Sequence, residues 1–142
     1  MFAGSARLSA FAGLFFVFAA TPAFAHEAGG ADARTIIQRQ LEAFQRNDAA
    51  GAFALASPGL KETYSNSTNF MDSVRSGDTP FFKRRMTEYH DFVSSGDNAA
   101  QSLILIDDDS SVWTVVYKLA RQPDGAWLID GVVLVKSDAV DA

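Results

Sequence analysis

Residues 111–136, SVWTVVYKLARQPDGAWLIDGVVLVK, decide the fold. Apolar side chains alternate with a period of two on both sides of the Pro-Asp-Gly sequence at 123–125, and this period is typical of β-strands. Pro-Asp-Gly favours a tight turn, because proline presets φ and glycine accepts a left-handed backbone. We therefore expect two antiparallel strands, 111–121 and 126–136, joined as a hairpin.

Two further strands are expected upstream, at 85–93 and 100–107. The segments that follow them, SSGD at 94–97 and DDDS at 107–110, are rich in residues that favour tight turns. Four consecutive strands with short connections predict an antiparallel meander.

Before residue 81 the apolar residues recur every three or four positions, which indicates helices. Three helices are expected, at 33–46, 49–56 and 69–76. Their expected N-caps are Asp32, Asp48 and either Ser67 or Thr68. Residues 60–66 are expected to be irregular, and Gly77 stands where a left-handed C-cap belongs.

Helices followed by strands predict an α+β fold, with the three helices packed on one side of a four-stranded sheet. The strands at 100–107 and 111–121 are apolar on both faces, whereas a sheet with one wet face alternates apolar and polar residues. Either the sheet curls to shelter its second face, or another subunit or partner covers it. A homodimer through the sheet is therefore one expectation.

The N-terminal segment has the pattern of a cleavable signal peptide. Arg7 precedes an uncharged stretch at 8–20, and Ala23-Phe24-Ala25 closes the segment with small residues. We expect cleavage after Ala25 and export to the periplasm or the medium. The remaining chain is expected to comprise a flexible lead-in, a single domain and a tail, at 26–32, 33–137 and 138–142.

Charge and composition narrow the classes of partner. Without residues 1–25 the chain keeps 11 basic and 17 acidic residues and contains no cysteine. A net negative domain without a basic stripe is a poor match for nucleic acid or anionic lipid. No membrane span is expected after cleavage, and the absence of cysteine excludes thiol chemistry.

Three stretches carry a resemblance to a known family: ALASP at 54–58, VRSG at 74–77 with Pro80, and DGAWLIDG at 124–131. Over residues 33–135 the chain resembles an uncharacterised bacterial domain-of-unknown-function family. That family is similar to the nuclear-transport-factor-2-like (cystatin-like, SnoaL-like) superfamily. The resemblance implies a strongly bent sheet wrapped on a long helix, a cone-shaped body with an internal pocket, and often a dimer. Some members of the superfamily are isomerases, dehydratases or hydrolases, and many are binding or assembly modules.

His90 and Asp91 are candidate catalytic residues on the first strand. The period of two places Glu88 and His90 on one face and Tyr89 and Asp91 on the other. If one set points into the cone, a His or an Asp is available as a general base beside a tyrosine donor. The alternative is an edge strand that carries ordinary polar residues.

Asp130 is a third candidate, because it lies inside an apolar strand. A buried carboxylate is costly unless it is paired. It could contact Lys118 across the ladder, serve a site, or be turned to water by a bulge at Gly131.

The candidate binding residues are the three tyrosines, Tyr64, Tyr89 and Tyr117. No cofactor or metal is expected. The acidic run at 107–109 lacks the ligand spacing of a calcium loop, and nothing indicates that His26 meets His90.

These observations favour an exported module that binds a small apolar molecule or a protein partner without catalysis. Two alternatives stay open: a cofactor-independent isomerase or lyase that uses His90 or Asp91, and a structural dimerisation module. An enzyme needs convergent ionisable groups in the cavity, a binder needs an apolar cavity, and an assembly module needs neither.

Overall fold

The computed structural model describes residues 22–137, with side chains from Gly29 onward. The predicted signal peptide lies mostly outside this range, as does the tail at 138–142. Four helices precede four strands in the described chain: α1 (Pro22–Gln45), α2 (Ala49–Ala54), α3 (Pro58–Tyr64), α4 (Ser67–Ser76), β1 (Arg84–Ser95), β2 (Asn98–Asp107), β3 (Val112–Arg121) and β4 (Trp127–Lys136).

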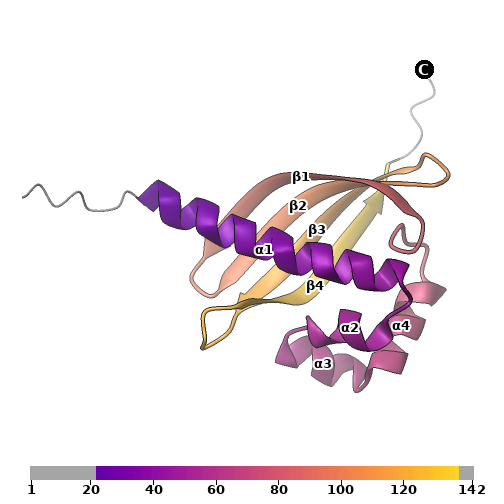
Figure 1. The fold of residues 1–142 in the computed structure, drawn as a ribbon, viewed down its shortest axis with the longest axis horizontal. Coiled ribbons are helices and arrows are strands. Elements are labelled where there is room, and N and C mark those ends of the chain that lie inside the picture. The colour runs from indigo at the N-terminus through magenta and orange to yellow at the C-terminus, as the bar shows by residue number, and fades with distance from the viewer. Residues whose placement is uncertain (1–21, 138–142) are drawn as a thin grey trace, which may run out of the picture.

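The strands form one antiparallel sheet in the order β1-β2-β3-β4. Figure 1 shows α1 lying across the curved sheet, with α2, α3 and α4 gathered below the C-terminal half of α1 in this view. The α+β class and the four-stranded meander are therefore confirmed. Gly96 and Gly125 adopt φ of 57° and 87° in the hairpin turns, a conformation that glycine accepts without steric cost.

The core lies between α1 and one face of the sheet. Ile37 and Leu41 are fully buried, as are Leu103 and Val115 from the two central strands. The other face remains open in the described chain. Its exposed apolar residues include Met86, Val112, Val133 and Val135, with 38–58% of their surface accessible.

Helix α1 begins earlier than expected. It starts at Pro22 rather than at residue 33, so Asp32 lies within the helix instead of capping it. Residues 26–32, expected as a flexible lead-in, are helical, and Gly30 is buried next to the ring of Phe92. No proline interrupts 23–45, and glycine in a helix costs only about 1 kcal/mol, which packing on the sheet offsets.

A helix forms where an irregular segment was expected. The expectation for residues 60–66 was wrong, because α3 occupies Pro58–Tyr64. Ser57 caps this helix by accepting a hydrogen bond from the N–H of Leu60 at 3.2 Å. Pro58 fills the first helical position, where its missing N–H costs nothing. The sequence Ser-Pro therefore starts a helix here instead of only ending the previous one.

The other helix ends confirm one expected cap and correct two. Asp48 caps α2 by accepting a hydrogen bond from a backbone N–H of that helix. Asn66 caps α4, so Ser67 and Thr68 were the wrong candidates by one or two positions. Gly77 has φ of −84° and is not a left-handed cap.

The segment between α2 and α3 is fixed to the free edge of β4. The N–H of Ser57 donates to the carbonyl oxygen of Ile129 at 2.7 Å, and the N–H of Ile129 donates to the carbonyl oxygen of Leu55 at 2.9 Å. This parallel bridge holds the start of α3 against the sheet and so forms one wall of a cavity.

Candidate ligand-binding cavity

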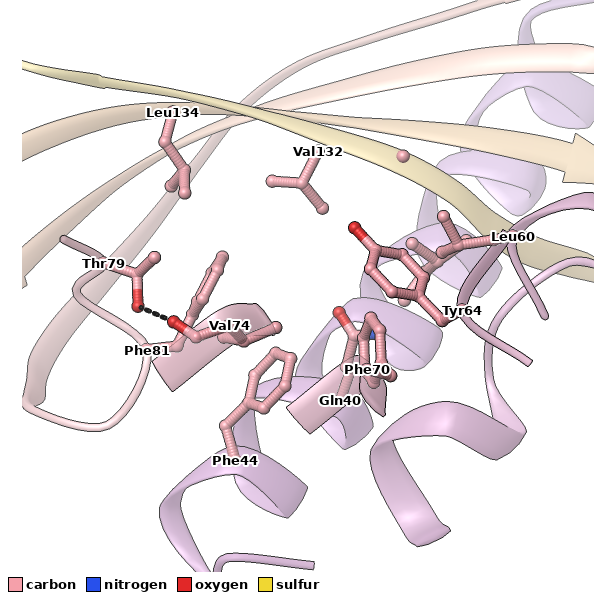
Figure 2. A pocket seen from close by; sticks show the side chains of 12 residues that line it. Gln40, Phe44, Leu60, Tyr64, Phe70, Val74, Thr79, Phe81, Val132 and Leu134 are labelled. Atoms are coloured by element: carbon pink, nitrogen blue, oxygen red, sulfur yellow. Dashed lines mark hydrogen bonds between the residues drawn. The ribbon is translucent and has the colours of Figure 1, made fainter. Parts of the chain in front are cut away.

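A cavity of about 170 Å³ lies between the helices and β4. Figure 2 shows side chains from α1, α3, α4 and the sheet converging on it. The lining residues are Gln40, Phe44, Leu60, Tyr64, Phe70, Val74, Thr79, Phe81, Ile129, Gly131, Val132 and Leu134.

Aromatic rings hold most of the helical wall in place. Phe44 stacks on Phe81 with a centroid separation of 5.0 Å, and it lies 6.0 Å from Phe70. Tyr64 meets Phe70 edge to face at 5.4 Å. Such ring pairs contribute about 0.5–1.5 kcal/mol each beyond the area they bury, so this wall is largely preformed.

Three polar side chains interrupt the apolar lining. The hydroxyl of Thr79 donates to the carbonyl oxygen of Val74 at 3.4 Å. The hydroxyl of Tyr64 points into the cavity toward Val132, and the amide oxygen of Gln40 also faces the cavity (Figure 2). Gln40 is 1% exposed.

The lining contains no strongly charged group. Among its twelve residues, all within the described chain, there is no carboxylate, imidazole, guanidinium or ammonium side chain. Across residues 29–137, no three His, Cys, Asp or Glu side chains gather as a metal site. No helix in the described range is long and apolar enough to cross a membrane.

His90 and Asp91 lie away from the cavity, in a bulge of the edge strand β1. The register shifts between Tyr89 and Phe92, so both His90 and Asp91 oppose Ser102. His90 is exposed, and its Nε2 lies 3.3 Å from a carboxylate oxygen of Glu88. The backbone N–H of Asp91 donates to the Ser102 hydroxyl at 3.0 Å.

The buried side chain of Gln101 stabilises this bulge. Its Nε2 donates to the carbonyl oxygens of His90 and Asp91 at 3.3 Å and 3.2 Å. These hydrogen bonds give the bulge a structural role. Neither His90 nor Asp91 lines the cavity, so the bulge does not bring either candidate base into it.

Asp130 is the extra residue of a bulge in β4, one position from the predicted bulge at Gly131. Lys118 pairs with Gly131 in the ladder, and Asp130 is exposed, so of the three alternatives the bulge that turns it to water is the one observed. Oδ1 of Asp130 accepts a hydrogen bond of 2.6 Å from the hydroxyl of Ser57. Asp130 thus reaches the cap of α3, next to the cavity but outside its lining.

The three tyrosines occupy different places. Tyr64 lines the cavity, whereas Tyr89 and Tyr117 do not. The Tyr89 hydroxyl donates to Oε1 of Gln38 at 3.2 Å, and burial raises the pKa of Tyr89. Tyr117 is fully buried, its hydroxyl has no hydrogen-bond partner among the described residues, and burial raises its pKa as well.

Gln40 is the site residue that the sequence interpretation missed. It lies beside the apolar stripe of Ile37, Leu41 and Phe44 on α1. A polar side chain next to a buried apolar stripe can reach the interior of the domain. Gln40 does so, because it is buried and lines the cavity.

The fold and the cavity together define a small α+β domain with an apolar, ligand-sized cavity between its helices and its sheet. The chain belongs to the family described as domain of unknown function DUF4864, which matches residues 26–142. This confirms the resemblance to an uncharacterised domain family.

The chain is also similar to an NTF2-like protein of unknown function from Burkholderia pseudomallei K96243. The identity is 12%, the TM-score is 0.42, and the similarity covers 75% of this chain and 91% of that one. Comparison with the curated proteins finds no match.

Proposed function

We propose that this domain binds a small, largely apolar molecule in its cavity without transforming it. The observation that carries the proposal is an apolar, aromatic-lined cavity into which two polar groups, on Gln40 and Tyr64, point. Ligand sites are typically built this way, with a few polar groups that orient a mostly apolar ligand. The candidate bases His90 and Asp91 lie outside the lining, which favours binding over catalysis.

The volume sets the size of the ligand. An apolar protein cavity of about 150 Å³ binds benzene, and this cavity measures about 170 Å³. Sites for drug-sized molecules occupy about 300–1,000 Å³. The ligand is therefore a single ring or a short aliphatic chain.

The protein is proposed to do this outside the cytoplasm. The support is the sequence pattern of residues 1–25, with Arg7 before an apolar stretch and Ala23-Phe24-Ala25 at its end. Mass spectrometry of the exported protein should show an N-terminus at His26. An exported chain that still begins at Met1 would contradict the proposal.

Binding can be tested with toluene as the probe, titrated into the protein and followed by NMR chemical shifts. Val132→Phe places a larger side chain in the cavity and should abolish the shifts. Val133→Phe is the matched control, because the next residue of β4 is 45% exposed and lies on the other face. Toluene shifts that are absent in the parent protein, or that persist unchanged in Val132→Phe, would refute binding at this cavity.

The open sheet face supports a further proposal, that two copies of the chain associate through it. Met86, Val133 and Val135 are 45–58% exposed there. They lie on the same face of the two edge strands, β1 and β4, and apolar residues exposed on one face can mark an interaction site.

A further inference from the structure

The amide of Gln40 has a defined orientation. Its Nε2 donates to the carbonyl oxygen of Ala52 in α2 at 3.4 Å. Turning the amide over would set two oxygens against each other, so the donor stays on Ala52 and Oε1 faces the cavity (Figure 2). Oε1 makes no hydrogen bond to any residue of the described chain. The cavity wall thus contains an acceptor that has no donor among the described residues and is open to the cavity.

A ligand that fills the cavity and covers this acceptor without pairing it loses affinity, because the oxygen then gives up its hydrogen bond to water. A ligand that brings an N–H or O–H group into the cavity removes this cost. A ligand of the same shape without a donor does not. The Gln40 oxygen therefore discriminates between ligands by their hydrogen-bond donors.

The same geometry selects against charge. The lining offers no cation to a carboxylate ligand, and the Gln40 oxygen presents a partial negative charge to it. It offers no carboxylate to an ammonium ligand either. Burying an unpaired charge costs far more than burying a neutral polar group.

We propose that Gln40 is the specificity-determining residue of the cavity and that it selects neutral ligands that donate a hydrogen bond, with phenol as the single-ring representative. The Tyr64 hydroxyl, which also points into the cavity, can donate to the oxygen of such a ligand. This inference rests on the proposed function, because it assumes that the cavity binds a small molecule.

The test compares phenol with fluorobenzene, which has nearly the same shape but lacks the hydroxyl donor, and with benzoate, which carries a charge. Dissociation constants come from NMR titrations at pH 7. In the parent protein phenol should bind about five- to tenfold tighter than fluorobenzene, as expected for one net hydrogen bond. Benzoate should not bind.

Gln40→Met keeps the length of the side chain and removes the acceptor. It should bind fluorobenzene at least as well as the parent does and lose the preference for phenol. Tyr64→Phe separates the two polar groups, because the preference should persist there if Gln40 is its origin. If Gln40→Met fails to fold, the parent protein and Tyr64→Phe still decide the question.

The outcomes separate the two proposals. Fluorobenzene binding without a preference for phenol in the parent would overturn the role of Gln40 and leave the binding function in place. A preference that survives Gln40→Met, or that disappears in Tyr64→Phe, would also overturn it. Failure of both neutral probes and of toluene to bind would overturn the proposed function and this inference with it.

Discussion

The hydroxyl of Ser57 donates a hydrogen bond of 2.6 Å to a carboxylate oxygen of Asp130, which lies 73 residues further along the chain. The same hydroxyl oxygen accepts from the N–H of Leu60 and caps α3. One serine therefore joins the first turn of α3 to the bulge of β4. Both elements contribute residues to the cavity, so this contact sets the spacing of two of its walls.

Removing this contact should weaken both the fold and the cavity. Ser57→Ala should lower the free energy of unfolding by about 0.5–2 kcal/mol, the usual cost of an N-cap serine. Asp130→Ala should lower the free energy of unfolding by part of this amount. The loss in the double variant should be smaller than the sum of the two single losses, because the residues share one interaction. Urea denaturation measures all three. Ser73→Ala on the exposed side of α4 is the control and should stay within about 0.5 kcal/mol of the parent.

Asp107 should make the fold sensitive to acid. It is buried, and burial by itself works to raise its pKa, but hydrogen bonds from the Trp113 indole and from the backbone N–H groups of Ser111 and Asp109 outweigh this and lower the pKa below its ordinary value. A carboxyl whose pKa is lower in the folded state stabilises the fold above its unfolded pKa of about 3.9. That stability is lost as the pH falls through the lower folded value.

Asp107→Asn is the variant that tests this dependence. Both carboxylate oxygens of Asp107 accept from N–H groups, so the NH2 group of the new asparagine would face one of these donors. The variant should therefore be about 1–3 kcal/mol less stable at pH 7. Its stability should also vary less with pH below about 4. Asp108→Asn, on the exposed neighbour, should follow the parent curve at every pH. Parallel acid curves for the parent and Asp107→Asn would show that this carboxylate is not the source of the dependence.

Trp127 should be essential for folding. It is 2% exposed and meets Phe92 edge to face at 6.2 Å, beside Gly29 of α1. Its neighbours on α1 are therefore in the N-terminal half of that helix. Trp127→Ala should cost about 3–5 kcal/mol, a large share of the stability of a small domain. A thermal melt checks this, with Val93→Ala, at a 62% exposed position, as the control.

A charge on the open sheet face should disrupt self-association. Val116 pairs with Val133 on that face, whereas Val115 is fully buried on the opposite one. The parent protein is expected to scatter light as a dimer at micromolar concentration, and Val116→Glu as a monomer with an almost unchanged melting temperature. A parent protein that is already a monomer under these conditions would remove the basis for a sheet-mediated dimer.

Local signals in the sequence were sufficient for the strands and for one helix cap. The period of two on each side of the Pro123–Gly125 turn predicted β3 and β4, and Asp48 was identified as a cap from its position alone. The Ser57-Pro58 start of α3 is equally local, but residues 60–66 were expected to be irregular. That error arose because the two helices are separated by only three residues, so one motif lies at the end of one and the start of the other.

The sequence by itself determined the α+β class, the order of helices before strands and which residues of a strand share a face up to each bulge, because these depend on neighbours in the chain. Only the tertiary structure decided which residues meet. The β1 bulge places Tyr89 and Phe92 on the same inner side despite their odd spacing. The cavity joins Gln40, Tyr64 and Val132 from three distant elements. Strand register and helix docking set these contacts, and both result from packing across the whole core rather than from any local pattern.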